Sequence, residues 1–263
     1  MRITLFTSNN IRHNYLINLL SSSCSELFVI QECKTIFPGT KPGRYPLSKI
    51  INSYFENVNK AQIKIFGNSY LYNSNKNLKI LPLAFDDLNN CSLNFLSPFL
   101  KSDLYIVYGS SYIKGELLEF LVKNKTINIH MGVSPYYRGT DCNFWALYDG
   151  NPHLVGATIH LLSKGIDSGK ILFHAMSNVK TNPYEYTMST VKSAFYSVSD
   201  RIKDKSLLKI ETLNQDRDKE IRYSKKVEFN EKILKDYLKK NIDLNSKKFD
   251  TALLKEPYFL KDE

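Results

Sequence analysis

The stretch Thr126–Trp145, TINIHMGVSPYYRGTDCNFW, decides how the rest of the chain is interpreted. It opens with alternating apolar and polar residues, the pattern of a half-buried strand. Side chains two apart on a strand share a face, so Asn128 and His130 project together where a loop with Gly132 and Pro135 begins. A carboxamide beside an imidazole suits chemistry in which a carbonyl becomes a tetrahedral oxyanion. The pair therefore predicts a reactive site that still needs a carboxylate.

Strand and helix patterns alternate on both sides of this stretch. The expected strands are 2–7, 27–31, 78–85, 104–108, 126–131, 155–162 and 171–175, and the expected helices are 13–21, 48–67, 93–100, 114–123, 143–148 and 183–202. This order predicts an α/β fold with a doubly wound, mostly parallel, Rossmann-like sheet. Ligands of such sheets bind beyond the carboxyl ends of the strands, where Gly109 and His130 both lie.

The chain changes character after residue 204. Residues 1–204 are expected to form the catalytic domain, and 205–263 a small C-terminal appendage that serves acceptor binding or a homodimer. The appendage is charged with both signs interleaved and carries a few aromatic residues. Residues 33–47, rich in Gly, Pro and basic side chains, are expected to form a loop.

Composition narrows the class of protein. The 263 residues are 43% hydrophobic and contain no apolar run long enough to span a membrane, and the N-terminus shows no signal-peptide pattern, so a cytoplasmic protein is expected. Four scattered cysteines are interpreted as reduced thiols, and no metal site is expected. The net charge of +10 suits polyanionic partners such as nucleotides or RNA, although solvated lysines are the favoured explanation.

Three motifs together resemble one family. The segments Asn128-Ile-His130, SPYYRG at 134–139 and GIDSGKIL at 165–172 are similar to the folate-dependent formyltransferases, whose pattern N-x-H-x-S-L-L-P-x-Y-R-G precedes L-D-T-G-x-I. The resemblance covers roughly residues 1–200 in strand order and is strongest over 126–172. This chain departs from the pattern at Gly132, where the family has serine, and at Ser168, which keeps a hydroxyl.

The resemblance implies a catalytic set of Asn128, His130 and Asp167, with N10-formyltetrahydrofolate as co-substrate. Asn128 and His130 would hold the oxyanion, while Asp167 would orient the imidazole, raise its proton affinity and relay the proton. A lone Asn or His at a strand end is more often a satisfied structural group. The three motifs in order favour catalysis here.

Further candidates follow from family position. The folate pterin is expected against two loops, at Gly109, Tyr112, Ile113, Lys114, Ser163, Lys164, Gly165 and Ile166. The acceptor substrate, whose amine would take the formyl group, is expected to contact Tyr136, Tyr137, Arg138, Gly139, Asn143 and Trp145. Trp145 suits a core position equally well. The remaining histidines in this half, His153, His160 and His174, are interpreted as structural.

Three acceptors can be compared. A glycinamide ribonucleotide enzyme would place a Gly-rich phosphate loop after the first strand, and TSNNIRHN at 7–14 has no glycine. An initiator-tRNA enzyme would carry a C-terminal barrel, for which the tail is short. The chain most resembles the sugar N-formyltransferases. These enzymes act on nucleotide-linked amino sugars, such as dTDP-amino sugars, that are used in the biosynthesis of lipopolysaccharide O-antigen. A methionyl-tRNA formyltransferase-like enzyme, a non-catalytic binding protein and a formyl-folate hydrolase are the alternatives.

Overall fold

The computed structural model describes residues 1–33, 48–69, 76–247 and 249–260, so the expected loop lies, from residue 34 on, outside the described residues. The strands are β1 Arg2–Ser8, β2 Glu26–Cys33, β3 Leu78–Ala84, β4 Leu104–Val107, β5 Ile127–His130, β6 Tyr137–Gly139, β7 Ala157–Leu161, β8 Ile171–Met176, β9 Arg222–Ser224 and β10 Tyr258–Phe259. The α-helices are α1 Ile11–Ser21, α2 Lys49–Phe66, α3 Leu93–Leu96, α4 Gly115–Lys123, α5 Cys142–Tyr148, α6 Pro183–Lys203 and α7 Glu231–Lys239.

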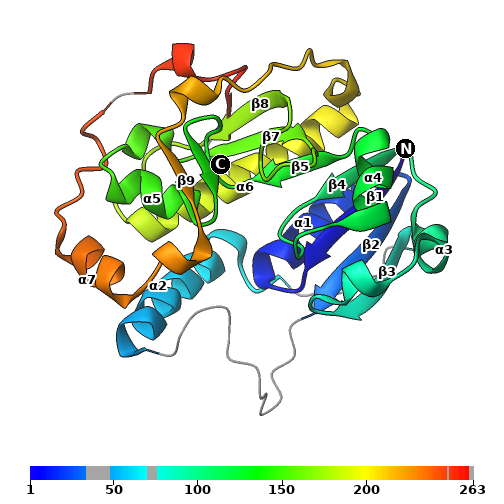
Figure 1. Cartoon of the computed structure of the whole chain (residues 1–263), viewed down its shortest axis with the longest axis horizontal. Helices are drawn as coiled ribbons and strands as arrows, with labels where there is room; N and C mark the ends of the chain where they lie inside the picture. The colour runs from blue at the N-terminus through cyan, green and yellow to red at the C-terminus, as the bar shows by residue number, and fades with distance from the viewer. Residues whose placement is uncertain (34–47, 70–75, 248, 261–263) are drawn as a thin grey trace.

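The described strands form an eight-stranded sheet in the order β10-β8-β7-β5-β4-β1-β2-β3. Every neighbouring pair is parallel except β5 with β7 and β7 with β8, which are antiparallel. Figure 1 shows the sheet crossing the molecule from β8 on one side to β3 on the other. The expected doubly wound, mostly parallel α/β fold is therefore confirmed.

Helices cover both faces of this sheet. Alternate residues of β1 belong to different core clusters: Ile3 and Leu5 pack with α1, α6 and the end of α2, whereas Phe6 packs with α3 and α4. This alternation is what a strand buried on both faces requires. Helix α1 begins two residues earlier than expected, because the His13 ring accepts the backbone N–H of Asn10 at 3.3 Å.

Three of the contacts between the tail after α6 and the rest of the molecule set the course of this segment. Strand β10 extends the main sheet beside β8, and β9 pairs with β6 in a separate two-stranded sheet. The third contact is a buried cluster in which Phe229, Leu234 and Tyr237 pack with Phe144 and Trp145 of α5. Figure 1 shows this tail running around the side of the molecule where α5 lies. The tail thus shares a core with the segment it follows.

None of the helices that the structure describes is both long enough and apolar enough to cross a membrane.

Candidate active site

The carboxyl end of β4 and the adjoining strands β5 and β7 form the frame of the site. Strand β5 pairs with β4 on one side and with β7 on the other, and Asn128 lies opposite His160 in the antiparallel register. The chain turns sharply after β4 at Gly109, whose φ is 66°. A Cβ there would lie 2.6 Å from the His13 ring, so this turn admits only glycine.

The loop between β7 and β8 presents Asp167. This residue has a left-handed backbone (φ 47°), an uncommon conformation for a residue other than glycine that is concentrated at functional sites. The Arg138 guanidinium donates to the carbonyl of Ile166 at 2.7 Å, and the Gln215 side chain donates to the Asp167 carbonyl at 2.8 Å. A Cβ on Gly169 would lie 1.7 Å from a carbonyl oxygen of β7. The loop is therefore held in one shape, as its two glycines predict.

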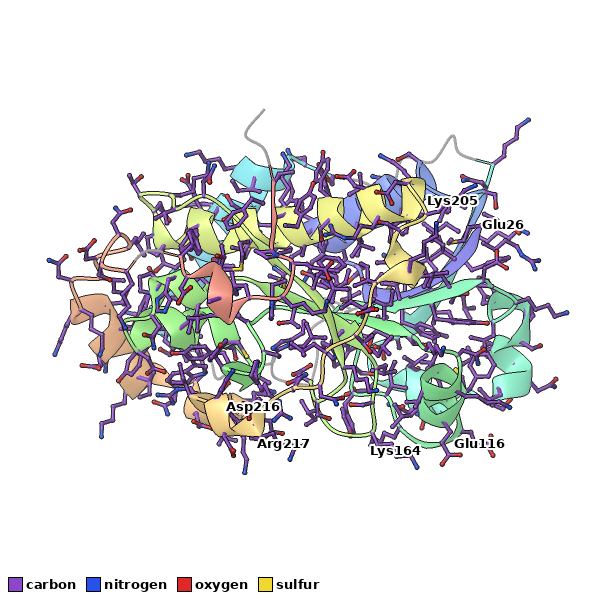
Figure 2. The ribbon with its side chains drawn as sticks, turned by 90° about the horizontal axis from the view of Figure 1, so that it is seen from above. Glu26, Glu116, Lys164, Lys205, Asp216 and Arg217 are labelled. Carbon is purple, nitrogen blue, oxygen red and sulfur yellow. The ribbon has the colours of Figure 1, made fainter. Side chains whose placement is uncertain are left out.

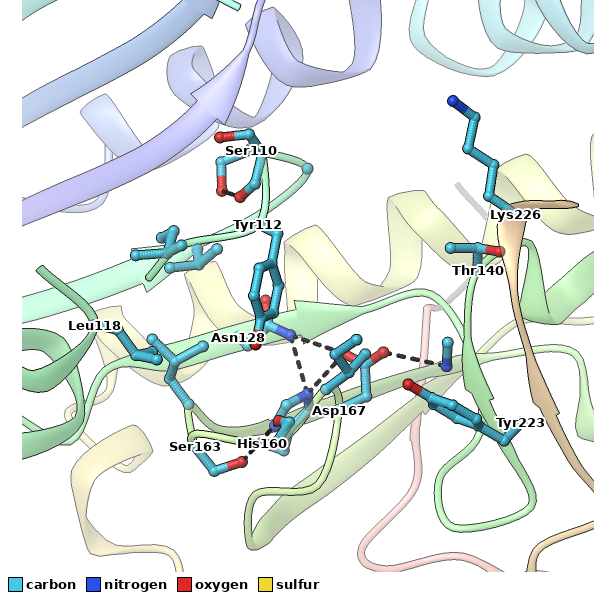
Figure 3. A pocket seen from close by; sticks show the side chains of 18 of the residues that line it. Ser110, Tyr112, Leu118, Asn128, Thr140, His160, Ser163, Asp167, Tyr223 and Lys226 are labelled. Carbon is cyan, nitrogen blue, oxygen red and sulfur yellow. Dashed lines mark hydrogen bonds and ion pairs between the residues drawn. The ribbon is translucent and has the colours of Figure 1, made fainter. Parts of the chain in front are cut away.

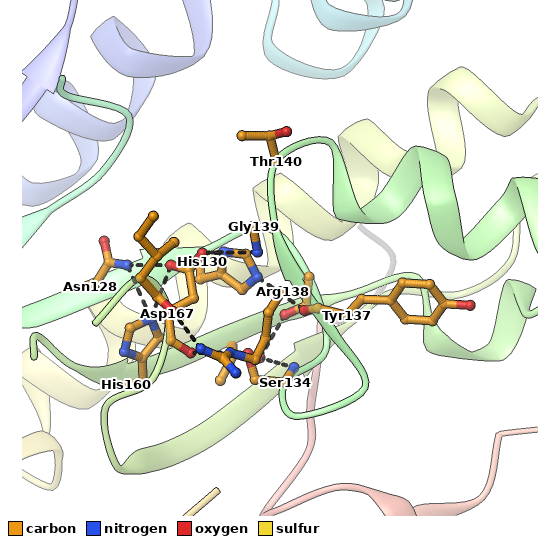
Figure 4. A network of polar contacts seen from close by, with 12 residues as sticks. Asn128, His130, Ser134, Tyr137, Arg138, Gly139, Thr140, His160 and Asp167 are labelled. Atoms are coloured by element: carbon orange, nitrogen blue, oxygen red, sulfur yellow. Dashed lines mark hydrogen bonds and ion pairs between the residues drawn. The ribbon is translucent and has the colours of Figure 1, made fainter. Parts of the chain in front are cut away.

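The structure brings the three predicted side chains together (Figure 4). Asp167 Oδ2 lies 3.3 Å from His130 Nδ1, and Asp167 Oδ1 accepts from Asn128 Nδ2 at 3.3 Å. The backbone N–H of Gly139 also donates to Asp167 Oδ2 at 3.3 Å. The predicted carboxylate is thus in contact with both the carboxamide and the imidazole, while the roles of the three groups stay predictions.

A fourth polar side chain, His160, also belongs to this cluster. Its Nδ1 donates to the Leu161 carbonyl at 2.8 Å, which leaves Nε2 to accept from Asn128 Nδ2 at 3.0 Å. The same Nε2 lies 3.7 Å from Asp167 Oδ1. His160 was interpreted as structural, and the antiparallel register of β5 and β7 sets it opposite Asn128, in contact with the predicted trio.

Burial and neighbouring charges set the protonation of the cluster. Burial lowers the pKa of His130, and the Asp167 carboxylate offsets only part of this effect. Asp167 thus raises the proton affinity of the ring, as expected, but burial has the larger effect. Burial alone would raise the pKa of Asp167, but His130, His160 and the Gly139 N–H outweigh it and hold that pKa at about 2. Asp167 is therefore ionised and His130 neutral at neutral pH.

His130 lies behind Asp167. It is 7% exposed and is not among the residues that line the pocket described below. Its Nε2 faces the Tyr137 carbonyl at 3.3 Å and its Nδ1 faces Asp167 Oδ2 at 3.3 Å, and the neutral ring can donate its one N–H to only one of them. Direct contact of His130 with a formyl oxygen would require the ring to give up the Tyr137 carbonyl.

A pocket of about 430 Å³ opens against Asn128, Asp167 and His160 (Figure 3). Six of the eight residues predicted to bind folate line it: Gly109, Tyr112, Ile113, Ser163, Gly165 and Ile166. Lys114 and Lys164 do not, and Figure 2 shows Lys164 at the outer edge of the molecule. Apolar side chains of Val107, Leu118 and Leu162 complete this side of the pocket.

Most of the residues predicted to bind the acceptor lie elsewhere. Tyr136, Tyr137, Asn143 and Trp145 are buried and do not line the pocket, so their predicted place is corrected. The aromatic rings form the core between α5 and the tail, and the Asn143 carboxamide accepts the Gly156 N–H at 3.0 Å.

The other two predicted acceptor residues lie close to Asp167. Gly139 lines the pocket, while Arg138 is buried, donates to the Asp167 loop and forms an ion pair with Glu220 at 2.7 Å. The departure at Gly132 also has a structural reason. A Cβ there would lie 2.6 Å from both the Cys142 Cβ and the His130 Nε2, so a side chain has no space.

The residues that the structure describes contain no group of three or more His, Cys, Asp or Glu side chains arranged to hold a metal ion. The four cysteines are not joined in disulfides in the structure.

Comparison with known families shows what the segment that holds this site is similar to. Residues 100–203, which contain Asn128, His130, His160 and Asp167, match a family described as Formyl transferase. This segment belongs to the formyl transferase family. The match ends with α6, so the tail that packs against the formyl transferase segment lies outside it.

Solved structures agree with this fold. The formyltransferase PseJ from Anoxybacillus kamchatkensis, in complex with UDP-4,6-dideoxy-4-formamido-L-AltNAc and tetrahydrofolate, matches with TM-score 0.50 and 19% identity over 93% of this chain and 95% of its own. A Helicobacter canadensis N-formyltransferase with folinic acid and dTDP-3-aminofucose matches with TM-score 0.51 and 12% identity, over 88% and 73%. Glycinamide ribonucleotide transformylase 1 from Symbiobacterium toebii matches with TM-score 0.51 and 14% identity, over 82% and 94%. At these identities the likeness concerns the fold.

Proposed function

We propose that this protein transfers a formyl group from N10-formyltetrahydrofolate to the amine of a nucleotide-linked amino sugar. The observation that carries the proposal is the contact of an ionised Asp167 with Asn128 and His130 at the wall of a pocket. A carboxylate, a carboxamide and an imidazole in contact supply the base and the oxyanion donor that acyl transfer needs.

The pocket fits the ring system of a folate. Its volume of about 430 Å³ is within the range of small-molecule sites, and its lining combines apolar side chains with residues of the Gly109 loop and of the loop that holds Ser163, Gly165 and Ile166. A flat heteroaromatic ring can stack on the apolar surface while its polar edge bonds to the backbone. The folate would supply a formyl group carried on nitrogen.

Asn128 and Asp167 would touch the reacting atoms. The Asn128 amide would donate to the formyl oxygen as negative charge develops there; its N–H groups are now directed at His160 and Asp167, so the oxygen replaces one of these contacts. Asp167 would accept the proton that the amine loses as its nitrogen bonds to the formyl carbon. It would pass that proton to the folate nitrogen as the bond from that nitrogen to the carbon breaks.

The sugar acceptor is supported by sequence and by charge. The motif SPYYRG with the later Asn-Phe-Trp resembles the sugar enzymes, and the net charge of +10 suits an acceptor that carries phosphates. The structures from A. kamchatkensis and H. canadensis contain nucleotide-linked sugars, whereas the S. toebii structure is a glycinamide ribonucleotide enzyme. The absence of glycine from Thr7–Asn14 favours the first class.

The test is an incubation of the protein and the formyl donor with a panel of dTDP- and UDP-linked 3-amino and 4-amino deoxysugars. Mass spectrometry should find one sugar nucleotide that gains one formyl group, and the Asp167→Asn variant should give roughly 10²–10⁴-fold less product in the same time. Formylation of glycinamide ribonucleotide or of charged initiator tRNA, with none of any sugar, would contradict the proposal.

A further inference from the structure

The wall of the pocket opposite the Gly109 loop is formed mainly by residues of the tail. Tyr223, Ser224, Lys225 and Lys226 line the pocket together with Thr140, and Figure 3 shows Thr140, Tyr223 and Lys226 on the opposite side from Ser110 and Leu118. Residues 223–226 lie beyond the segment that matches the formyl transferase family. We call Thr140, Tyr223, Lys225 and Lys226 the tail wall.

The tail wall is fixed relative to Asp167. Strand β9 pairs in parallel with β6, with Gly139 opposite Ser224, and the Thr140 N–H donates to the Ser224 carbonyl at 3.1 Å. The two strands are so close at Gly139 that a Cβ there would lie 2.1 Å from the Ser224 carbonyl oxygen. Because the Gly139 N–H also contacts Asp167 Oδ2, one residue connects the tail wall to the proposed reacting carboxylate.

The chemistry of the tail wall suits an anion beside a flat or sugar-like group. Lys225 and Lys226 are adjacent and exposed, and no described carboxylate lies within ion-pair distance of either ammonium. The Thr140 hydroxyl is buried and has no partner among the described residues, although buried polar atoms usually have one. The Tyr223 ring is 39% exposed, with the Arg138 guanidinium 5.5 Å from its centre.

We propose that the tail wall binds the diphosphate of the acceptor, with the lysines on the phosphates and Tyr223 against the adjoining sugar or base. The inference rests on the proposed function, because it names the part of this chain that recognises that acceptor. A diphosphate carries neighbouring charges that two adjacent ammonium groups match. The glutamate carboxylates of a folate are the other anion available, but the residues expected to hold folate line the opposite side of the pocket.

The test compares wild-type protein with a Lys225→Ala/Lys226→Ala variant and a matched control, Lys203→Ala/Lys205→Ala. The control removes two exposed lysines at the end of α6, and Figure 2 shows Lys205 on a different side of the molecule from Lys164. For K225A/K226A we expect the KM for the acceptor, and the Kd for UDP or dTDP by calorimetry, to rise about tenfold or more. The kcat and the KM for the formyl donor should match those of the control, because the lysines do not touch the reacting atoms.

A Tyr223→Ala variant should weaken the binding of UDP or dTDP while leaving that of inorganic pyrophosphate unchanged. An acceptor KM in K225A/K226A equal to that of the control would overturn the inference and leave the proposed function intact. A rise in the donor KM alone would overturn it in favour of the folate carboxylates. If no sugar is formylated, the proposed function fails, and calorimetry alone tests whether the tail wall binds a diphosphate. Binding of UDP or dTDP that K225A/K226A loses and the control keeps supports the inference. No binding to the wild-type protein overturns it.

Discussion

At the scale of single residues, the site is one carboxamide shared by one carboxylate and one imidazole. Both N–H groups of Asn128 have acceptors, Asp167 Oδ1 at 3.3 Å and His160 Nε2 at 3.0 Å. Exchanging the amide oxygen and nitrogen would set an oxygen against a carboxylate, so the network fixes which atom of Asn128 faces Asp167. The donor proposed for the formyl oxygen is therefore oriented before any ligand binds.

Replacement of Asp167 by Asn should remove the proposed base while keeping the shape of the loop. We expect kcat for formyl transfer to fall roughly 10²–10⁴-fold, with the protein still folded, because a positioned base contributes about that much. Steady-state kinetics and circular dichroism measure the two effects. Unchanged turnover in this variant would show that the carboxylate is not the base.

His160 is predicted to act as a positioning residue through Asn128. A His160→Leu variant leaves one N–H of Asn128 without an acceptor, and we expect kcat to fall about ten- to hundredfold, in line with the cost of an unsatisfied buried donor. A His160→Gln variant, which offers a carbonyl oxygen to the same N–H, should recover much of this loss. Equal activity of the Leu and Gln variants would rule out the hydrogen bond as the cause.

Sequence reasoning found part of this cluster. Asn128, His130 and Asp167 belong to motifs with fixed spacing, so they were predicted, as were six of the pocket residues on the two loops. His160 was missed because nothing local in the sequence gives the register between β5 and β7, and register alone sets it opposite Asn128. An antiparallel pairing of 157–161 with 127–130, had it been assumed, would have indicated it.

At the scale of elements, the SPYYRG stretch ends in a short strand, β6, which pairs with the tail. Its aromatic residues were predicted to contact the acceptor, but β6 pairs with β9 and the Tyr137 ring is fully buried. The sequence did not show this, because β9 is only three residues long and lies far away along the chain. Short strands of that kind carry almost no periodicity.

The close contact of β6 with β9 predicts different effects for two glycines. A Gly139→Ala substitution meets both a left-handed backbone (φ 94°) and the Ser224 carbonyl at 2.1 Å, so we expect a loss of roughly 3 kcal/mol or more in unfolding free energy, together with reduced activity. Gly150→Ala is the control: its φ is 72°, but no atom lies within 4 Å, so only about 1–2 kcal/mol should be lost.

Urea unfolding followed by the fluorescence of Trp145, the single tryptophan, measures both glycine variants. Trp145 is buried in the cluster that joins α5 to the tail, with the Arg222 guanidinium 4.3 Å from its ring centre, so it reports on this joint. Similar losses in the two variants would mean that the contact between β6 and β9 does not constrain Gly139.

At the scale of the whole molecule, a buried neutral histidine is one of the groups that hold the tail to the sheet. His174 of β8 donates from Nε2 to the Ser134 carbonyl at 2.8 Å and accepts the Lys255 N–H on Nδ1 at 2.8 Å. A protonated ring would lose the second bond. Burial lowers the pKa of His174 to about 4, so the ring is neutral at neutral pH.

This histidine should make stability depend on pH. The unfolded chain binds a proton at His174 below about pH 6.5, whereas the folded protein binds it only near pH 4. The contribution of His174 to the unfolding free energy is therefore fully present above pH 6.5. It is lost as the pH falls toward 4, and the loss is roughly 3 kcal/mol. Urea unfolding at pH 7.5 and 4.5 should show a larger loss for wild type than for a His174→Gln variant, which starts lower. Equal losses in the two proteins would contradict this role of His174.

The central claim, that this molecule moves a formyl group from folate to an amine, is tested most directly by following a labelled formyl carbon. Donor labelled at that carbon is incubated with the protein and the sugar nucleotide selected from the panel, and the label is traced by NMR, with Asp167→Asn protein alongside. We expect wild-type protein to move the label into a formamide on the sugar and the variant to leave nearly all of it on the folate. Label that appears as free formate, or that stays on the folate with wild-type protein, would contradict the account.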